Sequence, residues 1–239
     1  MAKQIREPGT YLYPLPVVLV SCGLGDEANI ITLSWVGTVC SAPPMVGIAV
    51  RPSRHSHHLI RDGGEFVVNL PTADQARAAD YCGRVSGKDA DKWTACGFTR
   101  AAGVRVRVPL IAECPVNIEC RLRHTVPLGS HDLFIGEVVA VHVDEAVLDE
   151  GGRVDFARLA PFLYTGRDYR RLGEQLALPE VPGTFFYLRR AVGRVSRVWP
   201  WRARRIASRS SQGYSTVPKH MDCSCPLPQA MTTSPARAI

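Results

Sequence analysis

The stretch RPSRHSHHLI, residues 51–60, gathers three histidines, two arginines and two serines into one short segment. A zinc site needs three or four converging ligands. His55 and His58 could share one face of a helix, but His57 would point away from both. No cysteine or carboxylate pair stands nearby at ligand spacing, so no metal site is predicted.

The same segment contains groups that bind a phosphate. Ser53, Arg54 and Ser56 open a predicted helix, whose free N–H groups and positive dipole end favour an anion. Arg51 and Arg54 add forked donors that match phosphate oxygens. The competing interpretation is a solvated helix face that carries these residues without a ligand, and the segment alone does not choose between the two.

A second group of polar side chains lies on the predicted strand NIITLSW, residues 29–35. Asn29, Thr32, Ser34 and Trp35 place hydrogen-bonding groups and a large flat ring within one strand. A polar heteroaromatic ligand needs such edge contacts together with apolar contact to its face. The alternative is an ordinary half-buried strand with Trp35 in the core. FVVNLP brings Asn69 back near this strand.

The elements that must position these residues are mostly strands. Alternating or β-branched runs predict strands at 14–22, 29–35, 45–51 and 65–71, and longer ones at 117–126 and 131–145. Helices are expected at 53–64, capped by Ser53 and ended by Gly63-Gly64, at 72–82 with a Thr72/Gln75 capping box, and at 86–97, closed by Gly97. No βαβ rhythm appears. The prediction is a small, mainly β barrel with helical excursions.

The net charge of +7 is unevenly distributed. Residues 185–239 carry ten of the 29 basic residues and one of the 22 acidic ones, so the first 184 residues are slightly acidic. The chain is therefore divided into a domain at 1–182 and a basic, Arg/Ser/Pro-rich tail at 183–239, expected to be mostly disordered. The basic balance belongs to the tail, and no nucleic-acid partner is predicted.

The N-terminal sequence has no charged-then-apolar signal layout, and no apolar run approaches a membrane span. Six cysteines are scattered singly through residues 1–184, which favours reduced thiols that act as small core residues. A cytoplasmic protein with no membrane partner is expected.

Five separated motifs carry a resemblance. The run from NIITLSW to FVVNLP, followed by CGRVSGKDADKW, ECPVNIEC, LGSHDLFIGEVVAV and FLYTGRDYRRLGE, resembles the flavin reductase-like, FMN-binding split-barrel family, flavoredoxin in particular. The resemblance covers residues 8–176 and does not extend into the tail. It implies a mainly β fold, an FMN-binding split β-barrel with Greek-key-like topology.

The resemblance also implies roles for individual residues. Asn29, Thr32, Ser34 and Trp35 would line the flavin ring and its ribityl chain, and Ser41 would edge the ring. Asn69 would lie near them. The FMN phosphate would be held by Arg51, Ser53, Arg54 and Ser56. Lys92, His131 and Tyr164 would lie around the redox face, one or more of them from a partner subunit. Lys92 and His131 are the candidates for tuning the flavin, although Lys92 could instead lie on a solvated helix face beside Asp89, and His131 could be structural.

The implied protein is a homodimeric NAD(P)H:flavin, or NAD(P)H:acceptor, oxidoreductase that holds FMN and binds NAD(P)H transiently. Its electrons would pass to free flavin, a partner oxygenase or another redox acceptor. The alternative is a non-enzymatic, flavoredoxin-type electron carrier with tightly bound FMN. A further alternative is a split-barrel domain that has lost flavin.

Overall fold

The structure is a computed structural model that describes residues 1–174 and 176 of the 239-residue chain. The expected boundary after Pro182 and the whole tail lie outside the described residues. The strands are β1 (Leu15–Pro16), β2 (Val18–Cys22), β3 (Asn29–Leu33), β4 (Val36–Ser41), β5 (Pro44–Val50), β6 (Glu65–Leu70), β7 (Arg100–Ala101), β8 (Leu110–Ile111), β9 (Val116–Pro127), β10 (Asp132–Val143), β11 (Phe162–Tyr164) and β12 (Tyr169–Arg171). The helices are α1 (His55–Gly63), α2 (Ala76–Arg84), α3 (Lys92–Cys96) and α4 (Phe156–Leu159). Short 3-10 turns lie at Gly25–Glu27, Ala73–Gln75 and Glu145–Val147.

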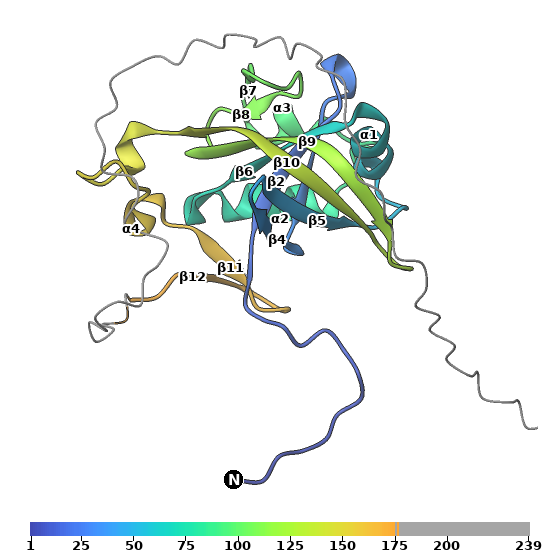
Figure 1. The fold of residues 1–239 in the computed structure, drawn as a ribbon, viewed down its shortest axis with the longest axis vertical. Coiled ribbons are helices and arrows are strands. Elements are labelled where there is room, and N and C mark those ends of the chain that lie inside the picture. The colour runs from blue at the N-terminus through green and yellow to red at the C-terminus, as the bar shows by residue number, and fades with distance from the viewer. Residues whose placement is uncertain (175, 177–239) are drawn as a thin grey trace, which may run out of the picture. The chain divides into compact units, whose positions relative to one another are not determined.

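One antiparallel sheet of seven strands dominates the described residues, in the order β3-β2-β6-β9-β10-β5-β4 (Figure 1). The two edge strands, β3 and β4, are consecutive in the sequence and are joined through Ser34 and Trp35. The sheet must therefore curl until its edges approach each other. The Ala49 N–H on β5 donates to the Trp35 carbonyl at 3.0 Å, which extends the β4–β5 pairing into the connection between the two edge strands. The curled sheet confirms the predicted mainly β, split-barrel fold.

The longest pairing is the hairpin of β9 and β10, which runs from Pro127 opposite Asp132 to Val116 opposite Val143. Two register irregularities interrupt it, and such bulges bend a strand and increase its twist. The interior of the curl is apolar, with Phe66 and Phe134 fully buried. Gly136 permits this packing, because a Cβ there would come within 2.5 Å of the Phe66 ring.

The helix ends agree only partly with the sequence. Gly64 and Gly97 adopt the left-handed conformation that ends α1 and α3, and the Thr72/Gln75 capping box is present before α2. The Ser53 cap was wrong, because Arg54 occupies the N-cap position and no side chain caps that end. The third helix starts later than expected, since the Asp91 carboxylate accepts from the Trp93 N–H.

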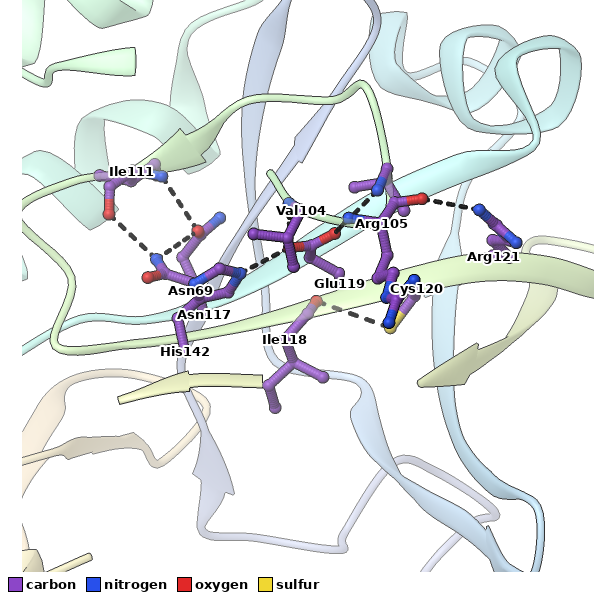
Figure 2. A network of polar contacts seen from close by, with 11 residues as sticks. Asn69, Val104, Arg105, Ile111, Asn117, Ile118, Glu119, Cys120, Arg121 and His142 are labelled. Atoms are coloured by element: carbon purple, nitrogen blue, oxygen red, sulfur yellow. Dashed lines mark hydrogen bonds and ion pairs between the residues drawn. The ribbon is translucent and has the colours of Figure 1, made fainter. Parts of the chain in front are cut away.

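A buried carboxylate stabilises the loop between β7 and β8. Glu119 on β9 is fully buried and accepts the backbone N–H groups of Val104, Arg105 and Val106 at 2.7–2.8 Å, as well as a hydrogen bond from His142 on β10 (Figure 2). Burial opposes ionisation of Glu119, but these donors outweigh it and hold the pKa of its carboxyl below the usual value. The loop is thus fixed to the sheet by a charge.

Candidate functional site

The seam of the barrel contains a hollow of about 190 Å³, which we call the ring hollow. Thr32 and Ser34 line it from the end of β3 and the turn that follows, Arg51 from the end of β5, and His131 from the start of β10. The Trp35 ring packs against His131, with ring centroids 4.5 Å apart and the planes tilted by 38°. Aromatic and hydrogen-bonding groups therefore meet in one place.

The electrostatics of the ring hollow favour a neutral imidazole beside two cations. Burial, together with the positive charges of Arg51 and Arg54, lowers the pKa of His131 below its ordinary value of 6.5. His131 Nδ1 lies 2.9 Å from the Ser130 hydroxyl. At neutral pH the ring is therefore uncharged.

A second hollow, of about 100 Å³, adjoins the first and is lined by the start of α1. We call it the anion cradle. Ser53, Arg54 and Ser56 lie on its α1 side, and Ser86 and Gly87 lie opposite. An uncapped helix start with serine and arginine side chains beside it supplies donors and positive potential for a phosphate.

The two hollows share the residues Ile31, Arg54 and Gly83 in their walls. The structure therefore brings the polar strand and the RPSRHSHH segment together. A direct bond fixes them to each other, since the Asn29 amide donates to the Ser56 hydroxyl at 2.9 Å and both side chains are buried. This contact makes Asn29 part of the cradle rather than of the ring hollow.

Two cradle residues were missed by the sequence reasoning. His55 lines the cradle, and its Nδ1 is a buried polar atom with no hydrogen-bond partner in the described part of the chain. Gly87 closes over it, and a Cβ there would lie 2.4 Å from Asn29 Oδ1 and 2.7 Å from His55 Cδ2. Only glycine fits such a close approach. The signal available in the sequence was the glycine of VSGKD.

Lys92 is buried in the wall of the cradle, 3% exposed. Its Nζ donates to the carbonyls of Ile30 and Cys82 at 2.7 and 2.8 Å. The surface alternative beside Asp89 is therefore wrong. Burial, and then repulsion by Arg54, lower the pKa of the Lys92 ammonium below 10.5 despite the opposing effect of nearby thiols. Lys92 lines the cradle and not the ring hollow, so the structure puts its charge beside the start of α1.

Three residues of the predicted site lie elsewhere. Asn69 is fully buried, and its amide nitrogen donates to the Leu19 carbonyl. Its amide oxygen accepts from the Ile111 N–H and the Asn117 amide (Figure 2). Ser41 is exposed at the end of β4 and lines neither hollow. These placements correct the expectation that Asn69 and Ser41 line the flavin site of their own chain.

Tyr164 lies on β11, in the small sheet formed by β1, β11 and β12. Its hydroxyl donates to the Gly166 carbonyl at 2.9 Å, and its ring packs beside Tyr13 and Tyr169. It lines neither hollow in this chain. Its predicted place at a redox face could arise only between subunits.

The histidines of the opening segment do not converge. His55 and His58 pack edge to face at 5.1 Å between centroids, whereas His57 is buried and bonds Asp132 at 2.8 Å on the barrel side. Among residues 1–174 and 176, no group of three or more His, Cys, Asp or Glu is placed to hold a metal ion. His57 thus fixes α1 to the start of β10.

A larger hollow, of about 930 Å³, lies around α4. Two of the arginines that line it are engaged in ion pairs: Arg153 pairs with Asp149 at 3.2 Å, and Arg171 pairs with Asp74 at 2.9 Å. Its size alone does not make it the candidate site, because none of the residues that the sequence predicted for flavin binding line it.

No helix of the described residues is long and apolar enough to cross a membrane.

The curled sheet, its seam and the two adjoining hollows together form a split barrel. Residues 10–173 match the model of the flavin reductase like domain, which covers more than half of the chain. The chain belongs to this flavin reductase-like family.

Solved structures agree with this assignment. Flavoredoxin of Desulfovibrio vulgaris (Miyazaki F) is 33% identical with a TM-score of 0.70, over 76% of this chain and 100% of that one. Flavoredoxin from Methanosarcina acetivorans is 32% identical with the same TM-score, over 77% and 98%. An FMN-binding protein from Thermus thermophilus, solved with bound 1-cyclohex-2-enone, is 28% identical with a TM-score of 0.64, over 75% and 98%.

A curated relative in Archaeoglobus fulgidus, an uncharacterised protein, is 37% identical over 139 residues, which cover 58% of this chain and 78% of the relative.

Proposed function

We propose that the protein binds FMN and acts as an oxidoreductase that accepts hydride from NAD(P)H. The observation that carries the proposal is the pair of adjoining hollows, one with aromatic and polar walls and one built as an anion cradle, with Arg54 bordering both. A heteroaromatic ring joined to a phosphate is the ligand that uses both.

The donors fit the group. The unpartnered Nδ1 of His55, the uncapped start of α1 and the glycine approach at Gly87 all lie at the cradle. Arg54 would bind phosphate oxygens, and Lys92 would supply a further N–H and positive charge. Asn29 would orient the Ser56 hydroxyl through the bond that already joins them.

The bound flavin would supply the hydride chemistry. Thr32 and Ser34 would contact the polar edge of the ring. The Trp35 ring and the neutral His131 ring, which pack against each other, would contact one face of the flavin ring. Trp35 is 40% exposed and the ring hollow is open to solvent, so a nicotinamide can approach without a dedicated dinucleotide fold.

A second copy of the chain is the proposed cover of this region. Val39, on the edge strand β4 and four residues after Trp35 in the sequence, is 52% exposed. Leu128, in the β9–β10 turn, is 61% exposed, and its N–H donates to the His131 carbonyl. Exposed apolar side chains of this kind favour an interface. Tyr164 would reach a flavin only across such an interface. We place the homodimer in the cytoplasm, with a partner oxygenase or another redox acceptor downstream.

Anaerobic titration tests the proposal. The purified protein should bind FMN tightly and riboflavin weakly, and should then oxidise NADH or NADPH in steady state with excess FMN. Failure to quench FMN fluorescence would refute flavin binding and favour a barrel that has lost its cofactor.

The alternative is an electron carrier, which the similarity to two flavoredoxins favours. It predicts tightly bound FMN with no turnover of either nicotinamide. Reduction of the bound flavin by a protein donor, with NADH and NADPH both inert, would replace the reductase by this alternative.

A further inference from the structure

Two cysteines from different helices meet behind the anion cradle. Cys82 on α2 and Cys96 at the end of α3 have their sulfur atoms 3.6 Å apart, and both thiols are free. Cys82 is buried, whereas Cys96 is partly exposed. A disulfide requires about 2.05 Å between sulfurs, so closing this pair needs a relative movement of about 1.5 Å.

The pair is connected to the site on both sides. Cys82 lines the cradle, and its carbonyl accepts the Lys92 N–H at 2.8 Å. The next residue, Gly83, borders both hollows and lies against Thr32, where even a Cβ would come within 3.3 Å. A change in the α2–α3 spacing therefore moves the common wall.

We propose that Cys82 and Cys96 are a peroxide-oxidisable dithiol whose disulfide loosens the anion cradle. The effect on flavin rests on the proposed function, whereas the disulfide does not. No other site on the described chain couples two thiols directly to the cradle wall.

The chemistry starts at Cys96. Burial and the neighbouring Cys96 raise the pKa of the Cys82 thiol to about 12, so the more exposed Cys96 is the sulfur that reacts first. The Cys96 thiolate attacks hydrogen peroxide, the O–O bond breaks, and a sulfenic acid and one water form. The Cys82 sulfur then displaces the sulfenic oxygen as a second water. Two thiols lose two electrons and two protons, and one peroxide becomes two waters.

Peroxide is a fitting oxidant, because reduced flavin that meets oxygen produces it. The dithiol would therefore respond to electrons that miss their acceptor. Cys82 and Gly83 form part of the cradle wall, and the Cys82 carbonyl holds the Lys92 ammonium at 2.8 Å. A displacement of this wall should therefore weaken phosphate binding in the cradle. We expect the Kd for FMN to rise by at least about fivefold, at the low end of ordinary coupling between sites.

Peptide mapping tests the disulfide. Trypsin separates the two thiols into peptides 78–84 and 93–100, each with one cysteine. After treatment of the wild-type protein with equimolar hydrogen peroxide and alkylation, we expect these two peptides as one linked species that dithiothreitol dissolves. Sulfinic acid at Cys96 without the linked peptide, or linkage to other cysteines, would overturn the proposal.

Flavin titration tests the coupling. FMN Kd should rise in peroxide-treated wild type and should return after dithiothreitol. Peroxide-treated Cys96→Ser should keep the Kd of the reduced protein, whereas Cys120→Ser should behave as wild type. A linked peptide with an unchanged Kd would overturn the coupling. If reduced wild type fails to bind FMN at all, the proposed function fails instead, while the mapping still decides the disulfide.

Discussion

Substitution of Lys92 by methionine separates its structural role from its role in the cradle. The Nζ group has three N–H donors, and the carbonyls of Ile30 and Cys82 take two of them. One donor remains for a ligand. A single hydrogen bond to a charged group contributes about 1.5–3 kcal/mol, so Lys92→Met should weaken FMN about ten- to a hundredfold. Riboflavin, which has no phosphate, should lose little.

The same substitution strips two backbone carbonyls of their donor. Leaving buried acceptors unpaired costs about 1–3 kcal/mol each, although relief from burying an ammonium offsets part of this. We expect the free energy of unfolding to fall by about 2 kcal/mol. Denaturant unfolding measures it, alongside fluorescence titration of FMN and riboflavin.

Lys88→Met is the matched control, because it removes the same charge from an exposed side chain. It should change FMN affinity by less than about fivefold. Equal losses for FMN and riboflavin in Lys92→Met, or an unchanged FMN Kd, would refute the reasoning that Lys92 meets the phosphate. Spectroelectrochemistry checks the remaining tuning role: a lowered midpoint potential would support it.

Three further predictions follow from the described contacts. Arg54→Ala should weaken FMN about tenfold or more while riboflavin is unaffected, as measured by fluorescence titration; equal losses would place Arg54 at the ring. Glu119→Gln should lower the free energy of unfolding by about 3 kcal/mol, because Gln cannot accept all the donors. Truncation after Pro182 should keep FMN binding, since all cradle residues precede it; lost binding would show a role for residues 183–239.

Acid unfolding checks the Glu119 charge with a definite sign. Its folded pKa is lowered below the ordinary value of 4.5, so its contribution to stability is fully present above pH 4.5 and is lost as the pH falls through the folded value. Wild type should therefore lose more stability than Glu119→Gln across this window. Parallel slopes of unfolding free energy against pH would refute this.

The sequence predicted the strands β2, β3, β5, β6, β9 and β10, because alternation and glycine turns are local signals, but it missed the edge strand β4 and the short strands β7, β8, β11 and β12. The segments NIITLSW and RPSRHSHH are close in the sequence, and the fold brings them together at the barrel seam, where both line the two hollows. The sequence reasoning misplaced Asn69, because a buried polar residue on a strand can serve the core, and the fold decides which. It left the environment of Lys92 open, because two carbonyls from distant elements bury its ammonium.

Helix starts were harder than helix stops. Gly64 and Gly97 need a left-handed backbone, which glycine adopts readily. By contrast, Ser53 is a residue type that commonly caps helices, but α1 begins one residue later than predicted, with Arg54 at the N-cap position. His55 was passed over because a histidine beside two others looks like metal chemistry. Its unpartnered Nδ1 becomes visible only once Gly87 closes over it.

Because Arg54 borders both hollows, a ligand that occupies them is held at two points by one continuous wall. Once one end is bound, the other sees an effective concentration set by the short chain between them, of the order of millimolar. Each end of the ligand can then bind weakly by itself, while the complete ligand dissociates slowly. For the proposed FMN, the ring would lift from its open hollow and return many times before the phosphate end releases, so a long residence time, and not shielding from solvent, would keep the cofactor bound.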